Sequence, residues 1–495
     1  MRSPMVRGVV GSVVVAVASL VTSVVPQSSW AASFPLRDSL PGRMVGLTFM
    51  VAGLGLMAWA WLTVGRRVMA GERLPLLRMT AYWSIPLLLA PPLFSRDAWS
   101  YAAQGALVAE GYNPYEVGPG VLSGHIVEAV DPMWMQTPAP YGPLPLAYGG
   151  LVAHLTMNPY LLMLAHRLLA VVGVVLIAWA VPRLATACRV DPAFATWLVV
   201  LNPMLITHGI GAAHNDMLML GLACSAFALA LTGHWGTAAV VAGTAAAVKL
   251  PGGLVAIAIA AVMSPLAGRL HRFASLVIAG AVSVLTLVTV GALTGVGSGW
   301  LGALDVPGLV RSPFSIANLI GMAASGVLGW LGEDTAAAQA LQIVRLIGMI
   351  AALGLIAWLS LRSSIHYAAR AVGVALLAVV VLGPSAHDWY FLWCLPFLAV
   401  ARPGRRLTTI ITAVSLIFTI AAPLNSSLRG ATIPILTTTA LVIAIALPLL
   451  NHLRTLQPAR KVPVTAAVVP PPATGSTAGG RLATAVPPPR PAPPQ

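Results

Sequence analysis

Long apolar stretches separated by short polar segments run along most of the chain. A bilayer-spanning helix needs roughly 20 mainly apolar residues, and stretches of this kind lie at 9–26, 44–64, 78–94, 160–181, 192–209, 213–232, 273–294, 339–361, 366–383, 406–423 and 433–451. Three shorter stretches have the look of broken or tilted spans: 235–249, 251–265 and 388–402. The pattern predicts an all-α polytopic membrane protein with about 13–14 transmembrane helices.

The two ends of the chain differ from this body. The first stretch could be a signal peptide, but its 18 mainly apolar residues are long for the apolar region of a signal sequence, so we expect a retained anchor helix. Prolines crowd the other end, which predicts a disordered cytoplasmic tail, with a partner-binding polyproline segment as the alternative. We therefore predict an anchor and short external loop (1–43), a transmembrane domain (44–454) and a tail (455–495).

The composition excludes soluble classes of protein. Hydrophobic residues make up 58% and charged residues 8% of the chain, with a mean hydropathy of +0.87, whereas soluble domains carry about a quarter charged residues. The net charge of +15 fits cations at cytoplasmic helix ends, and we expect no nucleic-acid partner. Three cysteines without paired spacing indicate neither a disulfide framework nor a zinc site.

The arginines predict which loops face the cytoplasm. Short cytoplasmic loops accumulate Lys and Arg, so the loop with Arg66, Arg67, Arg73 and Arg78 is expected inside. The third stretch then leads to a long loop, 95–159, which holds five of the thirteen acids and one arginine. This loop is therefore predicted to be external.

Two segments are predicted to be short interfacial or re-entrant helices of external loops, namely 143–157 and 313–331. Counting either one as a full span would put several arginine clusters on the wrong side of the membrane. With this topology the C-terminus is cytoplasmic, and the polar motifs collect on the external face of the plasma membrane.

Asp97 lies where the third apolar stretch ends. Ionisable groups kept near hydrocarbon usually face a water-filled cavity and carry function. Tyr101 and Gln104 follow at i+4 and i+7, so a helix would place on one face the groups that suit sugar hydroxyls. The alternative is that Asp97 only caps a helix beginning at Ala98.

Other polar motifs belong to the same face. YNPY contains Tyr115 and PAPYGPLP contains Tyr141, and both combine rigid turns with aromatic surface. We list these tyrosines as sugar-binding candidates, although aromatic residues at an interface more often anchor the protein in the membrane.

Two His/Asp motifs stand at predicted external helix starts. HNDM holds His214 and Asp216, and HDW holds His387 and Asp388. These four residues are candidates for binding acceptor hydroxyls, with simple helix capping by the aspartates as the alternative. The chain has no DxD motif, and a phosphate-bridging metal would draw more carboxylate oxygens. We therefore expect no metal and no cofactor.

Several of these motifs together resemble a known family. SRDAWSYAAQGALVAEGYNPYEVGPG, TPAPYGPLP, LNPMLITHGIGAAHNDMLMLGL, AVKLPGG and PSAHDWYFLWCLPF are similar to segments of the mycobacterial and corynebacterial alpha-1,6-mannosyltransferases. The resemblance runs in order from about residue 44 to about residue 420. It implies a GT-C-like bundle, a polyprenyl-phosphate mannose donor, a growing lipomannan acceptor and a catalytic carboxylate in the first external loop, which falls on Asp97.

The implied chemistry needs few groups. A base must take the proton of the acceptor hydroxyl, and cations must hold the donor phosphate. Asp97 is the predicted base, and a single base with no carboxylate nucleophile implies inversion, by analogy with glycoside hydrolysis. Lys249, Arg311 and Arg96 are the predicted phosphate ligands, although Lys249 could equally be a snorkelling anchor and Arg96 could instead neutralise its neighbour.

Two other classes of protein share some of these features. A secondary transporter or lipid-linked sugar flippase also needs many helices, but its charges usually lie at mid-membrane within a duplicated fold. A scaffold that displays the proline-rich tail would leave the long polar loop unexplained. The sequence thus favours an integral-membrane glycosyltransferase.

Overall fold

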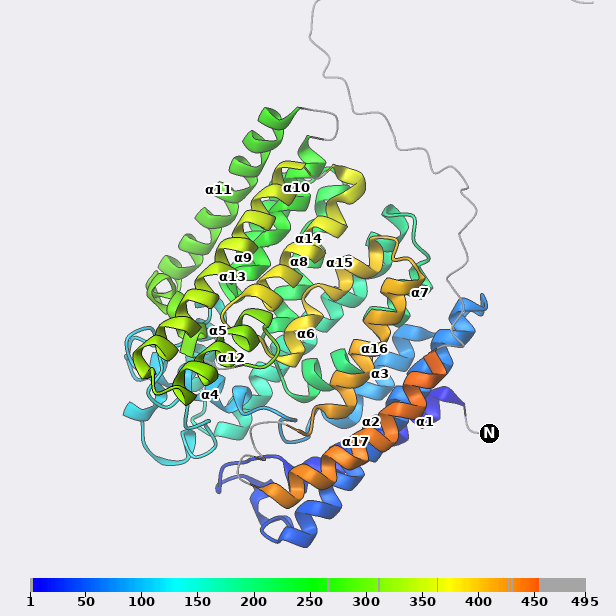
Figure 1. Ribbon diagram of the computed structural model, residues 1–495, viewed down its shortest axis with the longest axis vertical. Coiled ribbons are helices and arrows are strands. Elements are labelled where there is room, and N and C mark those ends of the chain that lie inside the picture. Colours follow the sequence, from blue (N-terminus) through cyan, green and yellow to red (C-terminus); the bar gives the residue numbers. More distant parts are fainter. Residues whose placement is uncertain are drawn as a thin grey trace, which may run out of the picture. The chain divides into compact units, whose positions relative to one another are not determined.

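The computed structural model describes residues 3–264, 268–309, 312–362, 364–424, 428 and 431–453, without the side chains of residues 303 and 307. The chain divides into a unit of residues 1–461 and a unit of residues 462–495, and the latter lies outside the described residues, as does the predicted tail from 455. Every regular element of the described residues is helical, and no strand occurs among them (Figure 1). This confirms the all-α prediction.

Seven described helices are long and apolar enough to cross a membrane. They are α1 (Pro4–Thr22), α2 (Leu40–Met69), α6 (Pro159–Ala187), α11 (Arg269–Leu293), α13 (Asp334–Arg362), η8 with α14 (Ile365–Tyr367 and Ala368–Leu382) and α17 (Thr432–Leu453). An eighth span is formed if the π-helical η5 (Leu205–Gly211) and α8 (Asp216–Leu231), bent by 116° at their junction, count as one. The chain is thus a multi-pass membrane protein.

The remaining predicted crossings are shorter or broken segments. They comprise α3 (Leu76–Ser84), η2 (Ile85–Leu87), α7 (Pro192–Val199), α9 (Trp235–Val248), η6 (Leu250–Val255), α10 (Ala256–Met263), η9 (Asp388–Leu392), α15 (Leu395–Val400) and α16 (Arg405–Ala421). Proline lies at most of the breaks, because its ring removes a hydrogen bond and clashes with the preceding turn. The break predicted at KLPGG is confirmed, since α9 ends at Val248 and Lys249 is extended.

The two segments predicted to be short helices are short in the structure. α5 (Pro143–Ala153) and α12 (Ile316–Trp330) have 11 and 15 residues, fewer than a straight span needs. The loop before α5 contains α4 (Asp97–Ala109) and two single turns, η3 (Pro119–Val121) and η4 (Gly124–Ile126). Two further 3₁₀ segments are η1 (Trp30–Ser33) and η7 (Gly299–Leu309).

The N-terminal helices pack through close backbone approaches. In Figure 1 the blue helices α1 and α2 lie beside the orange α17, and α2 contacts both of the others. A Cβ atom on Gly11 of α1 would stand 2.7 Å from the carbonyl oxygen of Gly53 in α2, so only glycine fits. Trp61 of α2 and Trp197 of α7 stack at 5.1 Å, and each indole donates to the other residue's carbonyl.

The contact between α6 and α8 brings the polar motifs together. A Cβ atom on Gly173 of α6 would stand 2.2 Å from the backbone of Met217, close to the start of α8. α4 also packs against α6. The first turns of α4 and α8 therefore lie near one another, although more than a hundred residues separate them in the sequence.

Candidate active site

Asp97 is the first residue of α4 and follows an irregular segment that begins after η2. Arg96 is the N-cap residue and makes no capping bond through its side chain, so the carboxylate belongs to the first turn. The alternative that Asp97 caps a helix starting at Ala98 is therefore wrong. A carboxylate in the first turn is still favoured by the helix dipole.

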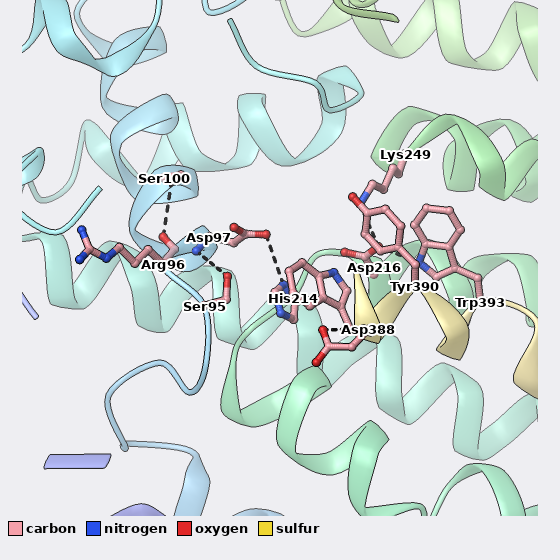
Figure 2. Close-up of polar contacts among 11 residues, drawn as sticks. Ser95, Arg96, Asp97, Ser100, His214, Asp216, Lys249, Asp388, Tyr390 and Trp393 are labelled. Atoms are coloured by element: carbon pink, nitrogen blue, oxygen red, sulfur yellow. Dashed lines mark hydrogen bonds and ion pairs between the residues drawn. The ribbon is translucent and has the colours of Figure 1, made fainter. Parts of the chain in front are cut away.

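The carboxylate of Asp97 is mostly buried but reachable. Its side chain is 16% exposed, and its Oδ2 lies 3.7 Å from Nδ1 of His214, which is longer than a hydrogen bond (Figure 2). Burial raises the pKa of Asp97 to about 6, and nearby Lys249 partly opposes this effect. At neutral pH the group is ionised yet basic enough to accept a proton, as a general base requires.

A second carboxylate, Asp216, starts α8 and is fully engaged on one oxygen. Its Oδ1 accepts hydrogen bonds from Lys249 Nζ at 2.9 Å and from Trp393 Nε1 at 2.7 Å. Lys249 also donates to the Tyr390 hydroxyl at 3.2 Å and faces the rings of Tyr390 and Trp393 at 4.2 and 5.0 Å. The charge of Lys249 is thus already matched inside the protein, and its side chain is only 12% exposed.

The two His/Asp motifs meet through stacked rings. Trp389 lies between His214 and His387, with ring centroids 4.0 and 4.3 Å away. Asp388 lies 3.7 Å from Nε2 of His208, a fully buried residue of η5. Burial lowers the pKa of His387 to about 4, so that imidazole is neutral near pH 7. The prediction that HND and HDW flank one site is consistent with this geometry.

The three predicted phosphate ligands are in different situations. Arg311 lies outside the described residues. In Figure 2 the side chain of Arg96 points away from the carboxylate of Asp97. Its Nε is buried and has no hydrogen-bond partner within the described part of the chain, and Nη1 reaches the carbonyl of Val130 only at 3.5 Å. Arg96 and Ser95 line a small cavity of about 20 Å³, room for about one water molecule, between residues of α2, the end of α1 and the segment before α4.

The predicted sugar-binding tyrosines are largely buried. Tyr101 is 2% exposed and packs edge-on against Tyr141, whose ring centroid is 5.1 Å away. The hydroxyl of Tyr115 donates to the carbonyl of Tyr141, so Tyr115 stabilises the loop. Gln104 is 2% exposed and lies one turn beyond Tyr101. The helical face predicted from Asp97 to Gln104 exists, but its far end faces the protein interior.

Many polar atoms of this part of the structure are buried and have no hydrogen-bond partner among the residues that the structure describes. They are Tyr101 Oη, Gln104 Oε1, both ring nitrogens of His166 and of His214, His208 Nδ1, both amide atoms of Asn215, Asp216 Oδ2 and Trp389 Nε1. Such atoms are uncommon in native proteins, because each costs about 1–3 kcal/mol when left unpaired. Their concentration here marks a site that water or a polar ligand completes.

Sequence reasoning did not single out several of these residues. Arg167 and His166 of α6 are each 1% exposed, and His208 is fully buried. Their signal was a charged or polar side chain inside an apolar stretch, which is costly and usually functional. No group of three or more His, Cys, Asp or Glu side chains that could hold a metal ion occurs among the described residues.

A bundle of membrane helices that surrounds a carboxylate of raised pKa with unpaired polar groups is typical of a membrane-embedded enzyme. Two family models match the chain: one described as the N-terminal domain of alpha-(1→6)-mannopyranosyltransferase, over residues 5–265, and one described as the MptB C-terminal domain, over residues 317–450. The chain belongs to this alpha-(1→6)-mannopyranosyltransferase family and is a glycosyltransferase.

Curated relatives agree along most of their length. A probable alpha-(1→6)-mannopyranosyltransferase of Mycolicibacterium smegmatis is 35% identical over 86% of this chain and 83% of its own. An alpha-(1→6)-mannopyranosyltransferase of Mycobacterium tuberculosis is 33% identical over 81% and 79%, respectively. Alpha-(1→6)-mannopyranosyltransferase B of Corynebacterium glutamicum is 33% identical over 79% and 72%. The resemblance inferred from the motifs is confirmed, and the activity is mannosyl transfer.

Proposed function

We propose that the protein transfers mannose from polyprenyl-phosphate mannose to a hydroxyl of a growing alpha-1,6-mannan on a glycolipid, with inversion at the anomeric carbon. The names of the relatives support the linkage. The observation that supports the mechanism is the mostly buried Asp97 carboxylate, whose pKa of about 6 suits a base working near neutral pH.

In this reaction Asp97 takes the proton of the acceptor hydroxyl as its oxygen attacks the anomeric carbon. The bond from that carbon to the phosphate oxygen breaks, and its electron pair leaves with the phosphate. Asp216 is held by Lys249 and Trp393, which argues against a role as a covalent nucleophile. Removal of the acceptor proton by Asp97, with no carboxylate acting as nucleophile, corresponds to one displacement and therefore to inversion.

Of the two predicted phosphate ligands among the described residues, Arg96 is less engaged by hydrogen bonds than Lys249. Its Nε has no hydrogen-bond partner among the described residues, and its side chain lines a small cavity and points away from the carboxylate of Asp97. In an in-line displacement the base and the leaving group lie on opposite sides of the reacting carbon. The cation that binds the leaving phosphate should therefore lie on the side of that carbon opposite to the base. Lys249 can contribute through the field of its charge, although two of its donors are already used.

His387 and Asp388 are the more accessible members of the motifs proposed to bind sugar, and Asp388 is 17% exposed. His214 lies between Asp97 and the stacked Trp389. We propose that the sugar hydroxyls bind beside His387, Asp388 and His214. Tyr101, Gln104 and Tyr141 would then support the site from beneath.

The direct test is transfer from radiolabelled polyprenyl-phosphate mannose to an oligomannoside acceptor in membranes, with the anomeric configuration of the new bond read by NMR. We expect an alpha linkage from a beta-linked donor. A product that retains the donor configuration would contradict a single displacement by Asp97. Export of unreacted donor without transfer would favour the flippase alternative.

The proposed active site faces outward, with the C-terminus in the cytoplasm. Cysteines introduced at Ser123 of the long loop and at Ser476 of the tail should differ in labelling by an impermeant thiol reagent on wall-stripped cells. The three natural cysteines are intermediate or buried, and the unaltered chain measures their background. Labelling confined to Ser476 would reverse the orientation and the side on which the donor is used.

A further inference from the structure

Arg167 is a buried residue of α6. It is 1% exposed, and no carboxylate of the described residues forms an ion pair with it. Its guanidinium instead donates four hydrogen bonds to backbone carbonyls. Nη1 reaches Leu88 at 2.9 Å and Ala90 at 2.6 Å, while Nε and Nη2 reach Ile210 and Gly211, each at 3.0 Å.

These carbonyls belong to two separate breaks in the helical structure. Leu88 and Ala90 start the irregular segment that ends at Asp97, and Ile210 and Gly211 end η5 just before His214. Both breaks expose carbonyls that have no partner within a helix, and such groups need a donor when they are buried. One planar guanidinium supplies donors in several directions at once, which the single ammonium of lysine cannot match.

The two breaks are also joined and constrained in other ways. The amide of Leu93 donates to the carbonyl of Gly211 at 3.2 Å. Phe94 in the first break and Ala213 in the second both have φ of 60°, a left-handed conformation that is unusual without glycine. Such residues persist only where their surroundings hold them in place.

We infer that Arg167 is a positioning residue that fixes the distance between Asp97 and His214 by clamping the two backbone breaks that carry them. It touches neither side chain. Its four bonds set where the breaks lie, and the breaks set the 3.7 Å separation of Asp97 Oδ2 and His214 Nδ1. The inference goes beyond the proposed reaction, because it concerns how the site is held rather than which group reacts.

The first test is Arg167→Lys, which keeps the positive charge but loses the planar set of N–H donors of the guanidinium. A small misplacement of reacting groups can cost about 100-fold in rate, so we expect kcat to fall by roughly 10–100-fold with donor KM little changed. The acidic limb of the pH profile should move below its value near pH 6, because loosened breaks admit water to Asp97. Arg183→Lys on the same helix is the matched control, since Arg183 donates to the carbonyl of Trp179 one turn earlier in α6 and lies over the Trp179 ring.

A disulfide offers an independent way to hold the breaks. A Cβ atom at Gly211 would stand 3.1 Å from Cγ of Leu93, so cysteines at 93 and 211 are close enough to bridge. In the Arg167→Lys background, oxidation of the Leu93→Cys and Gly211→Cys pair should restore most of the lost rate, and reduction should remove it again. The single cysteine variants show the effect of each substitution alone.

Three results would overturn the inference. They are an unchanged kcat and pH profile in Arg167→Lys, a confirmed disulfide that restores nothing, and a loss of activity when the pair is oxidised in the otherwise unaltered chain. The last comparison decides the matter even if Arg167→Lys does not accumulate. A failure of the proposed mechanism is distinguishable, because Asp97→Asn would then stay active while Arg167→Lys still lowered kcat.

Discussion

Asp97 and Asp216 begin two neighbouring helices, yet their surroundings differ. Asp216 is fully buried, and one oxygen is bound by a lysine ammonium and a tryptophan indole. Asp97 keeps some access to solvent, and its Oδ2 lies 3.7 Å from Nδ1 of His214, which is longer than a hydrogen bond. The same residue type at the same helical position is thus paired with a lysine in one case and left reactive in the other.

The two environments predict different roles for these two carboxylates. A matched charge stabilises the structure that contains it and has little reactivity left. An unmatched charge costs free energy of folding, and this cost is what raises the pKa toward the working range of a base. The following predictions test whether Asp97 and Asp216 really divide in this way.

The largest effect should come from Asp97→Asn. The amide keeps the shape of the side chain but cannot accept the proton, so transfer should fall by about 10²–10⁴-fold. Glu110→Gln at the exposed end of the same helix is the matched control and should be neutral. Activity within a few-fold of the unaltered enzyme would remove Asp97 from the base role.

Asp97→Asn should nevertheless accumulate normally. A carboxyl whose folded pKa of about 6 exceeds its unfolded value of about 3.9 makes the fold less stable as pH rises through that window. Near pH 7 the substitution removes a cost of up to about 3 kcal/mol. A lower melting temperature than that of the unaltered chain would show that the carboxylate is structural after all.

Breaking the Asp216 pair should act on stability instead. Lys249→Met leaves a buried carboxylate without its cation, and such losses cost about 3–5 kcal/mol. The double variant Asp216→Asn with Lys249→Met should recover much of it, because no unpaired charge remains. Thermal melting in detergent measures both.

The exposed pair of Arg67 and Glu72, with side chains 41% and 46% exposed, is the control for these variants. Glu72→Gln should change stability by no more than about 1 kcal/mol. If Lys249→Met melts like the unaltered chain but loses affinity for donor, Lys249 is a phosphate ligand rather than a partner of Asp216.

Arg96→Ala should weaken donor use more than acceptor use, since the phosphate belongs only to the donor. The expected change is about 1–3 kcal/mol, the scale of a lost charge-assisted hydrogen bond. Donor KM and acceptor KM are measured separately, and Arg96→Lys should retain part of the effect. An equal change in both constants would assign Arg96 to the structure of the loop.

The pH dependence should show an acidic limb near pH 6. Asp97 must be ionised to act as a base, so kcat/KM should fall about tenfold per unit below its pKa and level off above it. His387 is neutral throughout this range because its pKa is lowered to about 4. A limb near pH 4 would mean that Asp97 is solvated during turnover.

The smallest effect should be that of metal removal. Cations of the protein can neutralise the donor phosphate, so we expect EDTA to leave the rate unchanged. A loss that Mg²⁺ or Mn²⁺ restores would contradict the expected independence from metal.

Much of this architecture could be predicted from local patterns. Pro251 with the glycines that follow it marks a break that needs no knowledge of the fold. Asp97 was identifiable because a carboxylate at the end of an apolar stretch is costly. Hydropathy alone could not separate continuous spans from bent ones: the stretches 192–209 and 213–232 are predicted as two separate spans, whereas η5 and α8 form a pair bent by 116°.

Which residues pair with one another in the site could not be predicted from the sequence. Lys249 and Asp216 are 33 residues apart, and Arg167 binds carbonyls 77–79 residues before it and 43–44 after it. Carbonyls carry no side-chain signature, so nothing in the residue types reveals where that arginine points. Whether a charge is matched depends on such distant contacts, and this decides between a reactive and a structural role.

α4 and α8 both begin at the site, and this has a consequence for how inactive variants behave. The first turn of a helix carries roughly half a positive charge from its free amides. In the native chain the carboxylates of Asp97 and Asp216 offset that charge at the first turns of α4 and α8. Asp97→Asn removes the negative charge at the first turn of α4, which favours binding of the negatively charged donor phosphate. We therefore expect this variant to bind donor at least as tightly as the active enzyme while failing to consume it. That would make it a substrate trap for capturing the loaded state, and a weaker donor affinity in equilibrium binding would rule out this use.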